Sequence, residues 1–475
     1  MAVVWARALG GACGVAALLA ACAVPPPDRL DPARSAQSLQ SRRLDDPRLR
    51  RFIEAEQPAQ PADAPVRWDL GRLTLAALYF HPDLSIARSG LGLAQAQAET
   101  ARALLNPGLM ATVGRGAGGE FFSSPWIVGA AIDVLLESGD RRAFRIAEAD
   151  SSVQAARAGL RQAAWQVRAR VASSLLDLWS AQQRLGPLRE QLELQSQRSQ
   201  LYERRVESGE NPRDDLRREL TQRDQLATAL AQTEADLARA RADLAEAIGI
   251  PARALEAVAL AIGPLDQPPR IPDTALGDAA RTRALTERED VRDALARVDA
   301  AQADLQLQIS RRWPDIRLGP GYLFEQGNNR YEATVGLEWP ASIGGPIGEA
   351  RARRELAANR LLALQAHIVG QIDRATAAWR TSAQQAISAE ALLERAQQRE
   401  SAAQAKFDAG SLDRPALLAS RIDRISAQLS LQAVRERQQR AVAELEDALE
   451  LVLEPGQALT FPPEDSPSAS AAATP

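Results

Sequence analysis

Hydrophobic positions recur with a helical period over most of this chain. Leu230, Leu237 and Leu244 follow one another at every seventh residue, and residues 418–429 carry apolar side chains at alternating steps of four and three. This spacing is typical of coiled coils, so we expect the helices to pack against one another. An uninterrupted helix over 348–409 would be roughly 90 Å long, which exceeds what an ordinary globular core covers.

One segment of the pattern occurs twice. Residues 406–417 repeat the order of residue types in 205–216, with a glycine, an arginine and a leucine at the same positions. Each copy lies where one long helical pattern stops and another starts. A repeat of this length predicts a single structural unit present twice. We expect a first repeat over 67–260 and a second over 261–455.

Each repeat has the same predicted order of helix, two strands and two long helices. A first helix from about 69 to 105 is interrupted at His81-Pro82, because the residue before a proline disfavours the helical region. The strands are expected near 109–115, 126–135, 315–324 and 331–339. The remaining helices are expected over 140–208 (broken at Gly186-Pro187), 214–248, 277–312, 348–409 and 414–453, with hairpin tips at 209–213 and 410–415.

The strands alternate between apolar and polar residues. Segments of about ten residues with one apolar face and aromatic residues near their ends are typical of a transmembrane barrel. Soluble hairpins that pack one face on a helical core are the alternative. The residues that we expect to face lipid are Trp126, Val128, Ile132, Leu318, Tyr322, Tyr331, Val335, Leu337 and Trp339.

Four strands are too few to close a barrel, since single-chain barrels have at least eight. An open sheet edge inside lipid is excluded, because its backbone groups find no hydrogen-bond partner there. Several copies of the chain must therefore share one barrel. The expected fold is mainly α with a small β part: a long α-helical coiled-coil barrel joined to a transmembrane β-barrel to which each chain of an oligomer contributes four strands.

The first residues have the pattern of a secretory signal. Residues 1–21 contain an early arginine and a short apolar stretch, and Leu19-Ala20-Ala21-Cys22 resembles the bacterial lipobox. The resemblance implies cleavage before Cys22, with an N-acyl chain and an S-diacylglycerol group on that residue. Ala23 then implies sorting to the outer membrane. We expect 22–66 to be an extended acylated leader and 456–475 to be a disordered tail, since the latter is rich in Ser, Ala and Pro.

Composition excludes several function classes. The net charge is −4 and charges of both signs are interspersed, which gives no case for nucleic-acid binding. His81 and His367 are the only histidines, and Cys13 is lost with the signal, so neither a catalytic triad nor a zinc cluster is expected. The sequence therefore predicts no enzyme, no metal site and no cofactor other than the lipid on Cys22.

The duplicated order of elements behind a lipobox resembles the TolC-type outer-membrane efflux protein family. Three motifs carry this resemblance: His81-Pro82-Asp83-Leu84, Asn106-Pro107 before the first strand, and the turn at 407–417. The stretch 68–89, which includes residues 75–82, resembles the heavy-metal-efflux-like branch of that family. The resemblance implies a homotrimer that conducts substrate passively from an inner-membrane pump, through a helical tunnel in the periplasm and across the outer membrane. It leaves the exported substrate and the class of pump open.

The resemblance also implies that the hairpin tips form the periplasmic entrance and contact a periplasmic adaptor protein. Relatives place an acidic pair where this chain has Ala416 and Ala419, so any gate would depend on Asp215, Asp423 or the tip arginines. Ordinary solvated turns are the alternative for the tips. For the whole chain the alternative is a lipid-anchored adaptor, although an adaptor has a single helical hairpin. The expected docking residues are Gly209, Arg213, Asp215, Leu216, Gly410, Arg414 and Leu417.

Overall fold

The computed structural model describes residues 29–56, 67–116, 124–256, 258–269, 271–325, 327–340 and 342–453. The chain divides into two compact units, Met1–Arg42 and Arg43–Pro475. In the first unit the described part holds helix α2 (Pro32–Gln40), whose first turn is capped by the Asp31 side chain. The expected signal and Cys22, and the expected tail, lie outside the described residues.

Three helices open the second unit. They are α3 (Pro47–Glu56), α4 (Leu70–Phe80) and α5 (Pro82–Arg102). The predicted interruption at His81-Pro82 separates α4 from α5, and the His81 imidazole caps α5 by accepting a hydrogen bond from the Asp83 amide at 3.2 Å. Proline at the first helical position is favourable, because that position has no intrahelical donor to lose.

The leader differs from its expected extended form, since α2 and α3 are helical within 22–66. The reason in α3 is an apolar pair one turn apart, Leu49 and Ile53, which is buried. The Phe52 and Tyr79 rings also lie 5.5 Å apart, so α3 packs on α4. The sequence pattern was too short for this amphipathic face to be recognised among the surrounding charges.

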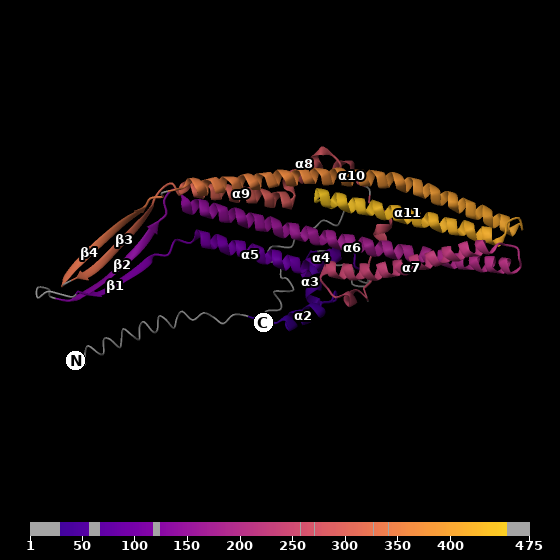
Figure 1. Ribbon diagram of the computed structural model, residues 1–475, viewed down its shortest axis with the longest axis horizontal. Helices are drawn as coiled ribbons and strands as arrows, with labels where there is room; N and C mark the ends of the chain where they lie inside the picture. Colours follow the sequence, from indigo (N-terminus) through magenta and orange to yellow (C-terminus); the bar gives the residue numbers. More distant parts are fainter. Residues whose placement is uncertain are drawn as a thin grey trace. The chain divides into compact units, whose positions relative to one another are not determined.

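The four strands form one antiparallel sheet in the order β1-β2-β3-β4. Each repeat contributes one hairpin to this sheet, and β2 pairs with β3 to join the two repeats. The strands are β1 (Gly108–Arg115), β2 (Trp126–Leu136), β3 (Asp315–Glu325) and β4 (Asn328–Glu338). Figure 1 shows the four strands grouped together, next to the starts of the long helices α6 and α10.

Long helices make up most of the second unit, which confirms the predicted mainly helical class. The 67 residues of α6 extend over roughly 100 Å at the usual helical rise. Its turn into α7 lies beside the turn between α10 and α11 (Figure 1). The helices are α6 (Arg141–Glu207), α7 (Arg213–Ile248), α8 (Asp278–Glu287), α9 (Glu289–Ser310), α10 (Gly344–Asp408) and α11 (Arg414–Leu449), with short 3₁₀ turns η1 (Ala252–Leu255), η2 (Gly263–Asp266) and η3 (Asp273–Ala275).

Two predicted helix boundaries are wrong. The expected break at Gly186-Pro187 is absent, because α6 continues through Pro187. Packing of α6 against α7 and α11, with Leu188 and Leu194 buried, holds the helix together despite the hydrogen bond that a proline removes. Conversely, the helix expected over 277–312 is divided at Arg288, whose backbone is extended.

Two main hydrophobic clusters stabilise the second unit. One surrounds α4, the middle of α6 and the end of α7, and the other joins α8, α10 and the end of α11. A smaller cluster of Leu194, Leu418 and Ile425 connects α6 to α11 near the helix turns. Within the described residues, no helix combines the length and the apolar character that crossing a membrane requires.

Candidate functional site

One face of the sheet is apolar across all four strands. The pairing register places Val128 opposite Phe324, and Leu318 opposite Val335, so the apolar rows of neighbouring strands lie on the same side. All nine residues expected to face lipid have exposed side chains, from 37% for Leu318 to 85% for Tyr331. No described helix covers this face, so it differs from a hairpin packed on a soluble core.

The opposite face of the sheet is polar. Arg317 lies between two carboxylates, with Asp133 at 3.3 Å on β2 and Glu338 at 2.9 Å on β4. Thr334 is opposite Gly319 on this same side. A methyl group added at Gly321 would meet the Ala131 side chain at 3.1 Å, so glycine permits the close approach of β2 and β3. Only one side of the sheet is therefore an apolar surface of the kind that contacts lipid.

Aromatic side chains mark both ends of the apolar face. Trp126 lies at one end, with the Arg115 guanidinium 5.9 Å from its ring, and Tyr331 packs near Tyr322. Trp339 follows the last residue of β4 at the other end and is 77% exposed. The eight steps from Tyr331 to Trp339 span about 26 Å along the strand. This length is close to the apolar band of about 25 Å that surrounds membrane barrels.

The two helix turns have the same local geometry. Gly209 and Gly410 adopt φ values of 78° and 73°, in the left-handed region that glycine tolerates best. In each turn the residue after the glycine donates its amide to a carbonyl five residues earlier, at 2.8 Å for Glu210 and 2.9 Å for Ser411. The duplicated sequence thus produces duplicated tips.

The predicted docking residues at the tips differ in accessibility. Arg213 and Arg414 both begin a helix and are exposed, and within the described part of the chain neither guanidinium has a polar partner. Leu216 is half-buried and Leu417 is only 4% exposed. The Leu417 side chain therefore belongs to the packing of its own hairpin, which leaves the arginines as the groups available to a partner.

The acidic residues near the tips make specific contacts. Asp215 accepts hydrogen bonds from Asn211 at 3.1 Å and from Arg218, and these bonds lower the pKa of its carboxyl group. Asp413 caps α11 through the Ala416 amide and also pairs with Arg205 of the other tip at 2.9 Å. Asp423 is exposed. The ion pair between the tips was not predicted, because it joins residues 208 positions apart.

A group of charged residues lies midway along the helices. Arg168 of α6 and Glu446 of α11 form a buried ion pair at 3.1 Å. At the break between α8 and α9, Arg288 donates to the carbonyls of Asp447 at 3.2 Å and Ala448 at 2.7 Å. These bonds satisfy the end of α11 and explain why the helix predicted over 277–312 is divided there. Sequence reasoning missed this cluster, since charges at helical spacing usually lie on a solvated face.

A family model described as outer membrane efflux protein matches residues 75–250 and 280–450, which together exceed half of the sequence. No curated protein matches the chain.

Solved structures share its fold. VceC, an outer membrane protein of Vibrio cholerae, is 18% identical with a TM-score of 0.65, and the match covers 81% of this chain and 97% of VceC. The outer-membrane channel OprN gives 19% identity and a TM-score of 0.68, with coverages of 91% and 100%. The MtrE outer membrane channel of Neisseria gonorrhoeae, solved in its open state, gives 18% identity and a TM-score of 0.66. This match covers 82% of this chain and 91% of MtrE.

Proposed function

This chain belongs to the outer membrane efflux protein family, and on that basis we propose that it is the exit duct of a tripartite efflux or secretion system. In this role it passively conducts substrate, delivered by an inner-membrane pump, through its helical part and across the outer membrane. The observation that carries the proposal is the four-stranded sheet with one exposed apolar face and one polar face. A membrane barrel with a water-filled lumen needs this arrangement.

The duct requires more than one copy of the chain. Strands β1 and β4 are the edges of the sheet, and each is paired on one side only. Joining β4 of one copy to β1 of the next satisfies both edges and closes the barrel. Three copies, the number known for the family that the sequence resembles, give about twelve strands, which lies within the range of outer-membrane barrels.

The remaining parts of the chain suit the same role. The helical tips, roughly 100 Å of helix away from the sheet, are placed to meet a periplasmic adaptor protein. The exposed guanidinium groups of Arg213 and Arg414 offer that partner charge-assisted hydrogen bonds. Acylation of Cys22 would add an anchor in the outer membrane, and the barrel would hold the protein there independently.

The test combines location, assembly and conduction. The full-length protein should fractionate with outer membranes, migrate as a heat-resistant oligomer in mild detergent, and give discrete conductance steps in planar lipid bilayers. A monomer that only detergent extracts from membranes, without conductance, would contradict the proposal. That result would instead suit an adaptor that is anchored only by its lipid.

A further inference from the structure

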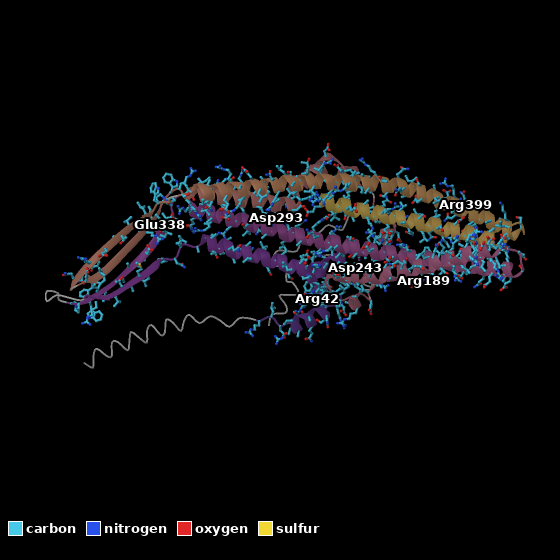
Figure 2. The ribbon with its side chains drawn as sticks, in the orientation of Figure 1. Arg42, Arg189, Asp243, Asp293, Glu338 and Arg399 are labelled. Carbon is cyan, nitrogen blue, oxygen red and sulfur yellow. The ribbon has the colours of Figure 1, made fainter. Side chains whose placement is uncertain are left out.

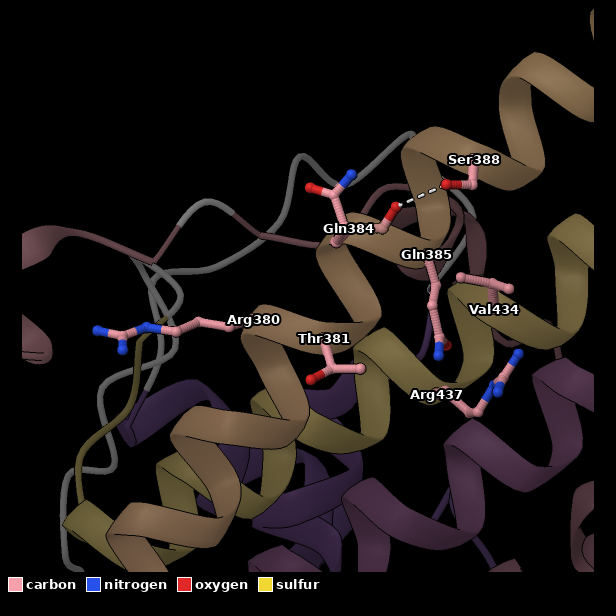
Figure 3. Close-up of a pocket in the computed structure, with 7 residues that line it drawn as sticks. All are labelled: Arg380, Thr381, Gln384, Gln385, Ser388, Val434 and Arg437. Carbon is pink, nitrogen blue, oxygen red and sulfur yellow. Dashed lines mark hydrogen bonds between the residues drawn. The ribbon is translucent and has the colours of Figure 1, made fainter.

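An open groove lies between α10 and α11 in the second repeat. Its volume is about 600 Å³, and Figure 3 shows the side chains of Arg380 and Gln384 from α10 and Arg437 from α11 along its sides. Arg380 is exposed and has no polar partner within the part of the chain that the structure describes. Arg380 and Arg437 give the lining of this groove a positive charge, which favours an occupant that carries negative charge.

In the first repeat, the linker after α7 contacts the residues of α6 that correspond to Arg380 and Gln384, and it also contacts Gln439 of α11. Trp179 and Gln183, one turn apart on α6, both donate to one carboxylate oxygen of Asp266 at 2.9 Å. Arg380 and Gln384 follow these two residues by 201 positions, the same offset that relates the two tips. They are also donors one turn apart, but they lack an acidic partner among the described residues.

The chain leaves the last helix of each repeat in the same way. Gly249 after α7 and Glu450 after α11 both adopt the left-handed conformation, with φ values of 83° and 48°. The next amide, of Ile250 or Leu451, bonds to the carbonyl five residues earlier at 3.0 or 3.1 Å. Both repeats therefore direct the following segment along their own hydrophobic cluster.

The sequence beyond this exit is repeated as well. Residues 259–268 read Ala-Leu-Ala-Ile-Gly-Pro-Leu-Asp-Gln-Pro, and residues 458–467, outside the described part, read Ala-Leu-Thr-Phe-Pro-Pro-Glu-Asp-Ser-Pro. The alanine, the leucine, the sixth-position proline, the aspartate and the final proline coincide. Asp465 thus corresponds to Asp266, and Glu464 adds a second negative charge.

A backbone position for this segment is also open. In the first repeat Trp68 forms an isolated parallel bridge with Leu260, with its amide bonded to Ala259 at 3.0 Å. Ile271 lies two residues before η3, the turn that leads toward α8, and Trp68 lies two residues before α4; both side chains are 8% exposed. Within the described residues, the backbone of Ile271 has no such partner.

We propose that residues 458–467 dock onto the second repeat of their own chain as residues 259–268 dock onto the first. Asp465 accepts hydrogen bonds from Arg380 and Gln384, and Leu459 lies beside Ile271. The groove between α10 and α11 is then the receptor for a specific part of the tail, in place of the wholly disordered tail expected from composition. The inference depends on the repeated sequence and contacts, and it stands apart from the proposed export function.

Cross-linking between introduced cysteines tests the docking in the full-length protein. Gln385→Cys combined with Ser466→Cys places thiols next to the proposed contact while leaving Asp465, Arg380 and Gln384 intact. A short bismaleimide should join them within one chain: the product migrates as a monomer in a denaturing gel, and mass spectrometry identifies the linked peptides. Arg184→Cys with Gln267→Cys is the matched pair beside the observed Gln183–Asp266 contact, and it should react to a similar extent.

Further variants decide whether the contact is specific. Arg380→Glu should reduce the Gln385–Ser466 cross-link to the level of a Gln385→Cys/Ser470→Cys pair, and Arg380→Lys should restore it in part. The Arg184–Gln267 pair in the same Arg380→Glu background reports that the protein is folded. If Ser466 reacts no better than Ser470 while the first-repeat pair reacts efficiently, or if the link joins two chains, the proposal is overturned.

Discussion

At the scale of single residues, Leu337 and Thr334 lie three positions apart on β4 and on opposite faces of the sheet. Leu337 belongs to the apolar face and is 63% exposed, whereas Thr334 is opposite Gly319 on the polar face. Both side chains are accessible within one chain, so a polar substitution at either would be harmless in a soluble protein. The two positions therefore separate a membrane sheet from a soluble one.

We expect Leu337→Arg to destabilise the assembled protein by about 2–4 kcal/mol, because it places a charge in the hydrocarbon region. Thr334→Arg should have a much smaller effect, since the new side chain points toward water. The yield of oligomer in outer membranes and its resistance to urea measure both. Equal losses for the two variants would show that the face assignment is wrong.

The carboxyl group of Glu450 is partly buried, and this burial disfavours its charged form. One carboxylate oxygen accepts the Glu289 amide at 2.6 Å, while the other is buried with no hydrogen-bond partner among the described residues. Burial raises the pKa of this carboxyl group from 4.5 to about 7, with Asp290 and Glu289 adding to the effect and Arg288 opposing it. The folded protein therefore holds a proton there that the unfolded chain releases.

The free energy of unfolding should consequently fall as the pH rises from about 4.5 to about 7. Glu450→Gln removes this dependence, and we expect it to stabilise the protein on the order of 1–2 kcal/mol at pH 8 and less at pH 5. Thermal unfolding at the two pH values is the measurement. Glu444→Gln, an exposed position on the same helix, is the control and should show no such difference.

At the scale of elements, the sequence predicted those boundaries that are decided locally. Glycine at the tips and proline after His81 end helices through their own backbone preferences, and α4, α5, α7 and α11 begin within a few residues of their expected starts. Tertiary contacts decided the others. Packing carries α6 through Pro187, while the binding of Arg288 to the end of α11 divides α8 from α9.

The candidate surfaces also divide into features that the local sequence decides and features that tertiary contacts decide. Alternation along each strand identified the nine exposed apolar residues, because the side-chain period of a strand is fixed. Pairing between β2 and β3 joins strands from different repeats, so the register that aligns their apolar rows was not available from the sequence. Burial of Leu417 likewise depends on the partner helix and was missed.

The two tips should contribute together to adaptor docking. Arg213→Glu with Arg414→Glu reverses two exposed charges at helix starts, where each loses a charge-assisted hydrogen bond of about 1.5–3 kcal/mol. We expect docking to weaken at least about tenfold, measured by site-specific cross-linking to the adaptor together with an export assay. Assembly should be unchanged, because the tips lie far from the sheet.

Arg399→Glu provides the matched control for the tip variant. Arg399, labelled in Figure 2, is an exposed arginine like the two at the tips. It belongs to α10 and lies eleven residues before Gly410. Its reversal should leave docking and export unaffected. Normal cross-linking and export in the double tip variant would return Arg213 and Arg414 to the role of solvated turn residues.

At the scale of the whole molecule, membrane attachment is expected from two independent sources. The lipobox predicts acylation of Cys22, and the sheet has an exposed apolar face of its own that we expect to contact lipid. Cys22→Ser should abolish incorporation of labelled fatty acid while the oligomer still forms in the outer membrane. Label that persists on the variant would exclude this residue as the acylation site, and complete loss of the oligomer would show that the lipid is needed for assembly.

The two open edges of the sheet have a consequence for how the protein matures. A solitary copy exposes unpaired backbone on β1 and β4, so it gains little from entering a bilayer by itself. For the proposed duct we therefore expect insertion and subunit association to be a single concerted event, with a rate that rises more steeply than in proportion to the number of newly made chains. Until enough copies meet, each one remains a water-exposed intermediate whose unpaired strand edges can aggregate. We therefore expect chaperones to bind the unassembled chain.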